Sequence, residues 1–111
     1  MKSFEEIRSD KRFIPKQKGI DGGNGWVTVK GKSLYVIYSN GGNWEHVSAS
    51  LHDRCPTWEE MCTIKDIFFN DDECCVEYHP KKSDYVNVHP YCLHIWRPIG
   101  LEIPTPPTSF V

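Results

Sequence analysis

Residues 44–51 read Trp44-Glu45-His46-Val47-Ser48-Ala49-Ser50-Leu51, and the fold of this 111-residue chain can be worked out from them. Successive side chains of a β-strand point to opposite faces of its sheet, so Val47, Ala49 and Leu51 share one face. The opposite face then carries Trp44, His46, Ser48 and Ser50. The alternation predicts a strand with one apolar face and one face of indole, imidazole and hydroxyl groups.

Residues 92–97 read Cys92-Leu93-His94-Ile95-Trp96-Arg97 and repeat this pattern. Leu93 and Ile95 are expected to face a core, while the residues between them face the other way. If one helix covers the apolar sides of both strands, the opposite face of the sheet carries imidazoles, hydroxyls and indoles in place of the usual Lys, Glu and Thr. Such a face is suited to contact another molecule.

A helix is predicted after Pro56, where the spacing of apolar residues changes from two to three or four. Thr57 can cap its first turn, and Glu60, three residues later, completes a capping box. One side of the predicted helix, residues 57–70, carries the stripe Trp58, Met61, Cys62, Ile64, Lys65 and Phe68. We expect this stripe to be the packing face of the helix, and Trp26 to lie in the core with it.

The remaining segments complete a two-layer α+β fold. They predict a short helix at 3–12, strands at 26–30, 33–38 and 73–79, and a short strand or extended arm at 84–88. We expect a mostly antiparallel sheet of about five strands, with the 57–70 helix covering one face. Residues 1–98 form a single domain in this interpretation, and the Pro-rich residues 99–111 form an extended C-terminal tail.

Composition and charge exclude several classes of function. A net charge of −2 and a pI near 6.2 provide no basic surface for a nucleic-acid backbone or an anionic membrane, so we expect no sequence-independent DNA binding. The chain has no apolar run of about 18 residues and carries acids near its start, which favours a cytoplasmic protein without a membrane span. Its five cysteines include no Cys-x-x-Cys pair and are interpreted as reduced thiols.

Three motifs resemble those of a small phage and prophage protein family of unknown function. They are Trp44-Glu45-His46-Val47-Ser48, Pro56-Thr57-Trp58-Glu59-Glu60-Met61 and His89-Pro90-Tyr91-Cys92-Leu93-His94-Ile95-Trp96-Arg97-Pro98. The resemblance covers roughly residues 26–98 and brings no established activity. It implies an accessory protein made by a phage in the cytoplasm of its bacterial host. By analogy, such a protein binds and neutralises a host component, for example one of antiviral defence.

The residues themselves favour a binding module over an enzyme. The predicted recognition surface consists of Trp44, His46, Ser48, His79, His94, Trp96 and Arg97. Indoles can stack on a base or an arginine, imidazoles and hydroxyls can hydrogen-bond, and the Arg97 guanidinium can hold phosphate or carboxylate. The expected partner is a host protein or a small nucleotide-like ligand. A homo-oligomer is also expected, because so much indole and tyrosine suits a monomer surface poorly.

A phosphodiesterase-like hydrolase is the alternative. Enzymes of that kind use two His-x-Ser/Thr motifs on facing strands, one imidazole acting as base and the other as acid. His46 and Ser48 supply one such motif, and His94 would supply the second imidazole. The matching position, Trp96, has no hydroxyl group.

Two further chemistries are weighed against a structural role. No cofactor is predicted, but His89, Cys92 and His94 lie within six residues, with His79 and Cys74 or Cys75 nearby, and zinc favours such nitrogen and sulfur ligands. Their spacing matches no standard zinc motif. Cys55 precedes the predicted helix close to Arg54 and could be a reactive thiol, although such turns often hold an inert cysteine.

Overall fold

The computed structural model of the chain describes residues 1–69, 74–79 and 91–99, and it places these residues in one open antiparallel sheet with two helices. The sheet order is β1-β2-β3-β4-β6-β5, and every neighbouring pair is antiparallel. The elements are α1 (Phe4–Ser9), β1 (Phe13–Lys18), β2 (Gly22–Val29), β3 (Lys32–Ser39), β4 (Trp44–Leu51), α2 (Trp58–Phe68), β5 (Cys75–His79) and β6 (Tyr91–Pro98). The predicted α+β class, with one main helix, is confirmed.

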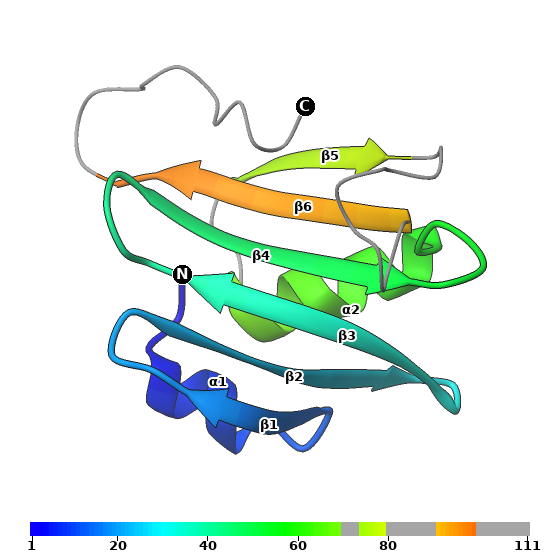
Figure 1. The fold of residues 1–111 in the computed structure, drawn as a ribbon, viewed down its shortest axis with the longest axis horizontal. Coiled ribbons are helices and arrows are strands. Elements are labelled where there is room, and N and C mark those ends of the chain that lie inside the picture. Colours follow the sequence, from blue (N-terminus) through cyan, green and yellow to red (C-terminus); the bar gives the residue numbers. More distant parts are fainter. Residues whose placement is uncertain (70–73, 80–90, 100–111) are drawn as a thin grey trace.

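Both helices lie on the same side of the sheet, as Figure 1 shows. The apolar sides of β4 and β6 face them: Val47, Ala49, Leu51, Leu93 and Ile95 are all buried. The centre of the core is aromatic, because the Phe13, Tyr38 and Phe68 rings meet at centroid distances of 5.4–5.7 Å. With both helices on one side, the described elements leave the other side of the sheet without a covering helix.

α2 begins and ends close to the prediction. The Thr57 side chain accepts a hydrogen bond from the Glu60 backbone, and the Glu60 carboxylate accepts one from the Thr57 backbone, which is the predicted capping box. The helix ends at Phe68, and Phe69 is its C-cap. Its buried side chains are Glu60, Met61, Ile64, Ile67 and Phe68.

The predicted packing stripe of α2 was wrong for Trp58, which is 72% exposed. A helix advances 100° per residue, so the row through Trp58 and Cys62 runs beside the row through Met61, Ile64 and Phe68. Only the second row faces the sheet. Cys62 is exposed as well.

Trp26 does not lie in the core either. Val27 and Val29 are buried on the helix side of β2, so the alternation of the strand turns Trp26 to the opposite side. There it is half-buried and meets Tyr35 of β3 edge to face, with ring centroids 6.2 Å apart.

The sequence did not predict β1. This strand buries only Phe13 and contains Pro15, and its pairing with β2 shifts register between Pro15 and Gln17. A proline and a bulge are tolerated here because β1 is an edge strand. The helix predicted at 3–12 is shorter, Phe4–Ser9, with Ser3 as its N-cap. The strand predicted at 84–88 and residues 100–111 of the predicted tail lie outside the described residues.

The buried Glu60 carboxylate predicts acid-sensitive stability. Its oxygens accept hydrogen bonds of 2.6 and 2.9 Å from the Arg54 guanidinium, which lowers the pKa of Glu60 below its ordinary value of 4.5. A carboxyl whose pKa is depressed by folding stabilises the protein above its unfolded pKa, and this contribution is lost as the pH falls through the folded pKa. We expect Glu60→Gln to cost about 1–2 kcal/mol at neutral pH and less in acid.

Denaturant unfolding of both proteins at about pH 7 and about pH 3 measures this difference. An equal loss of stability on acidification in the two proteins would show that the Arg54–Glu60 pair does not stabilise the fold.

Candidate functional site

The side of the sheet away from the helices carries the candidate site, and we call it the open face. Strand register arranges its residues in cross-strand rows over β3, β4, β6 and β5. The first row is Tyr35, Ser50, Cys92 and His79. The second is Ile37, Ser48, His94 and Glu77, and the third is Ser39, His46, Trp96 and Cys75. The open face thus brings together residues from four strands that are far apart in the sequence.

Two histidines and a cysteine form a cluster at the β5–β6 end of the open face. His79 pairs with Cys92 across the two strands, and His94 lies two residues further along β6. Cys92 Sγ is 3.5 Å from His94 Nε2, and the imidazole centroids of His79 and His94 are 5.0 Å apart. We call these three residues the His–Cys cluster. The zinc candidate His89 lies outside the described residues.

Burial changes the acid–base properties of the open-face imidazoles. Removal from water, and then the neighbouring imidazoles of His79 and His46, lower the pKa of His94 to about 4. Burial alone also lowers the pKa of His46. Burial therefore favours the neutral form of both side chains. A neutral imidazole can hydrogen-bond or bind a metal, but its remaining N–H is a far weaker acid than that of the imidazolium form.

The two tryptophans predicted for the site pack against each other. The ring centroids of Trp44 and Trp96 are 5.1 Å apart, with the rings inclined at 77°. Trp96 is only 4% exposed, whereas Trp44 is partly exposed. Trp96 therefore belongs to the open face by register but presents almost no surface to a partner.

Arg97 does not lie on the predicted recognition surface. It follows Trp96 in β6, so strand alternation directs it to the opposite side of the sheet. There it pairs with Glu45 in register, and its Nε atom is 3.7 Å from Glu45 Oε2. The guanidinium already has a carboxylate neighbour, and it does not share a side with His46, Ser48 and His94.

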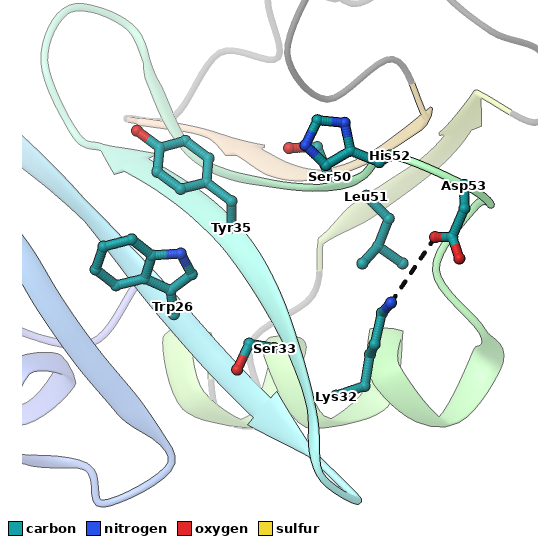
Figure 2. A pocket seen from close by; sticks show the side chains of 8 residues that line it. All are labelled: Trp26, Lys32, Ser33, Tyr35, Ser50, Leu51, His52 and Asp53. Carbon is teal, nitrogen blue, oxygen red and sulfur yellow. Dashed lines mark ion pairs between the residues drawn. The ribbon is translucent and has the colours of Figure 1, made fainter.

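A hollow at the β2–β3–β4 end of the open face was missed by sequence reasoning. It measures about 390 Å³ and is lined by Trp26, Lys32, Ser33, Tyr35, Ser50, Leu51, His52 and Asp53. Figure 2 shows the Trp26 and Tyr35 rings on one side of it and the His52 and Asp53 side chains across from them. Lys32 Nζ lies 3.9 Å from Asp53 Oδ1 at the edge. The alternation of Trp26 and Thr28 with the apolar Val27 and Val29 was the signal that could have placed this indole correctly.

The environment of Cys55 argues against a reactive thiol. Burial raises the pKa of this group, and this effect outweighs the hydrogen bond from the His79 backbone and the positive charge of Arg54. The thiol instead donates a hydrogen bond to the Cys92 carbonyl oxygen at 3.8 Å. Cys55 is therefore a structural residue in a turn beside β6.

Comparison with known proteins gives one family. Residues 36–100 match the family described as "Domain of unknown function (DUF7694)". The matched segment begins within β3, runs through β6 and includes the entire His–Cys cluster, whereas Trp26, Lys32, Ser33 and Tyr35 of the hollow lie before it. No curated protein and no solved structure matches the chain. Within the described residues, neither helix is long and apolar enough to cross a membrane.

Proposed function

Because the chain belongs to the DUF7694 family, whose function is unknown, we propose its function from the site alone: it is a binding module that sequesters a small nucleotide-like ligand on its open face. The observation that carries the proposal is the aromatic-walled hollow between Trp26 and Tyr35 on one side and His52 on the other. Its volume of about 390 Å³ falls within the usual range for small-molecule sites, about 300–1,000 Å³.

The lining of the hollow suits a planar ring attached to polar groups. Trp26 and Tyr35 offer ring surfaces on which a base can stack, a contact worth about 1–3 kcal/mol per base. Ser33 and Ser50 contribute hydroxyls to the lining, and Lys32 contributes a cation. The Asp53 carboxylate beside Lys32 can accept hydrogen bonds from ring amino groups or sugar hydroxyls.

The biological setting we propose rests on the motifs that resemble phage and prophage proteins. In that setting the chain is a phage-encoded accessory protein that works in the cytoplasm of a bacterial host. Sequestering a nucleotide-like ligand would deprive a host component, such as an antiviral defence system, of its signal or substrate. Assembly into a homo-oligomer stays a prediction.

One observation favours the alternative of a phosphodiesterase-like hydrolase. Ser48 lies directly opposite His94 in the β4–β6 pair, so a hydroxyl and an imidazole are neighbours as that chemistry requires. However, burial lowers the pKa values of His46 and His94, which disfavours the imidazolium form that would act as the acid. Chromatography of a nucleotide recovered after incubation separates the two functions, because a hydrolase would return it cleaved and a binding module intact.

Replacing Trp26 with alanine is expected to weaken nucleotide binding by about 10-fold or more, because the main stacking surface is lost. Calorimetric titration of the full chain with ATP, GTP, CTP and UTP measures the effect. Trp58→Ala is the matched control, since Trp58 is an exposed indole on α2, on the other side of the sheet.

Binding by the unaltered chain that survives in Trp26→Ala would place the ligand elsewhere. Failure of all four nucleotides to bind would contradict the proposal and leave a protein partner as the occupant of the open face.

A further inference from the structure

The His–Cys cluster is separate from the hollow and has a chemistry of its own. Its members come from two antiparallel strands, and their shared face follows from register: His79 is opposite Cys92, and His94 is two residues beyond it on β6. One ligand atom from each of the three residues lies within 4.8 Å of the other two. Two imidazoles and a thiol so close together form a potential metal-binding set.

The distance between the donor atoms of Cys92 and His94 matches that of a tetrahedral zinc site. Zinc–nitrogen bonds of about 2.0–2.1 Å and zinc–sulfur bonds of about 2.3 Å place the two donor atoms about 3.5 Å apart at the tetrahedral angle. The distance between Cys92 Sγ and His94 Nε2 is 3.5 Å. These two atoms could therefore bind one ion without a change in the β6 backbone.

His79, the third member of the cluster, has a buried polar atom that lacks a hydrogen-bond partner among the described residues. This atom is Nε2 of the imidazole ring. A buried polar atom without a partner costs about 1–3 kcal/mol. A metal ion bound to Cys92 and His94 could also accept a lone pair from the His79 imidazole.

We propose that His79, Cys92 and His94 bind a Zn²⁺ ion on the open face. The sequence suggested His89, Cys92 and His94 with His79 nearby, and strand register is what brings His79 next to Cys92. Three protein ligands leave the fourth position of a tetrahedral ion open for water or a ligand group. Purely structural zinc sites have no such open position. On the neighbouring strand β4, Ser50 lies opposite Cys92 and Ser48 lies opposite His94. This site does not depend on nucleotide binding in the hollow.

Substitution of Co²⁺ for Zn²⁺ tests the site without any assay of activity. We expect the full chain to bind one equivalent of Co²⁺ with tetrahedral visible bands and a near-ultraviolet thiolate-to-cobalt band, and Zn²⁺ to displace it. Cys92→Ser should abolish the thiolate band. Cys75→Ser is the matched control, because Cys75 is an exposed thiol on the neighbouring strand, and it should leave the spectrum unchanged.

His79→Gln provides a second test that does not depend on the buried Cys92. His79 lies on the edge strand β5, so circular dichroism should show the same fold, while Zn²⁺ affinity falls by at least about 100-fold. A full chain that binds no stoichiometric Co²⁺ or Zn²⁺ would overturn the proposal and leave Cys92 and His94 as a hydrogen-bonded thiol–imidazole pair. An unchanged thiolate band in Cys92→Ser, or unchanged Zn²⁺ affinity in a folded His79→Gln protein, would overturn it as well.

Discussion

Trp96→Ala is expected to lower the free energy of unfolding by about 3–5 kcal/mol, because it removes a large side chain that is almost fully buried. The substitution would remove the edge-to-face contact with Trp44. It would also leave a cavity beside β6, the strand between β4 and β5. A domain of this size has a net stability of only about 5–15 kcal/mol, so the thermal melt should fall sharply.

Two further variants make the Trp96 result interpretable. Trp58→Ala removes an exposed indole and should change stability by no more than about 0.5 kcal/mol. Trp96→Phe keeps part of the buried surface and also removes the indole N–H, which has no hydrogen-bond partner among the described residues, so it should cost less than the alanine variant. A Trp96→Ala protein with an unchanged melt would show that Trp96 is a contact residue and not a packing residue.

Phe68→Ala is expected to be comparably destabilising, by about 3–5 kcal/mol. Phe68 is fully buried near the end of α2, and its ring contacts those of Phe13 and Tyr38 at centroid distances of 5.6 and 5.4 Å. The substitution would therefore separate the helix from β1 and β3 at the centre of the core. Equilibrium unfolding in denaturant measures the loss.

The position of Phe68 also separates stability from function. Because the ring lies on the helix side of the sheet, nucleotide binding by the folded fraction should be retained. Trp58→Ala, on the same helix, again serves as the control. A loss of stability below about 1 kcal/mol would contradict the assignment of the Phe13, Tyr38 and Phe68 rings as the centre of the core.

Local sequence patterns predicted the parts of the fold that depend on near neighbours. Alternation in residues 44–51 and 92–97 assigned Val47, Ala49, Leu93 and Ile95 to the core. Thr57 and Glu60 identified the start of α2, because a capping box is formed by residues three positions apart. These features need no knowledge of the rest of the chain.

Features that depend on distant segments could not be predicted in the same way. The pairing of His79 with Cys92 is set by register between β5 and β6, which one sequence does not encode locally. β1 was missed because its single buried apolar residue, Phe13, gives no periodic signal. Trp58 was assigned to the core as part of the helical stripe, and Trp26 was assigned to the core with it. Trp58 lies in the row beside the buried one, and the strand alternation around Trp26 places that residue outside the core as well.

The most direct test of the open face as a binding surface is an amide and indole NMR spectrum of the full chain, recorded with and without the nucleotide that binds best in calorimetry. The indole signal of Trp26 and the amide signals of Tyr35 and Ser50 are predicted to shift, while those of α2 stay in place. Shifts confined to α2, or a spectrum that does not change at saturating nucleotide, would contradict a ligand site on the open face.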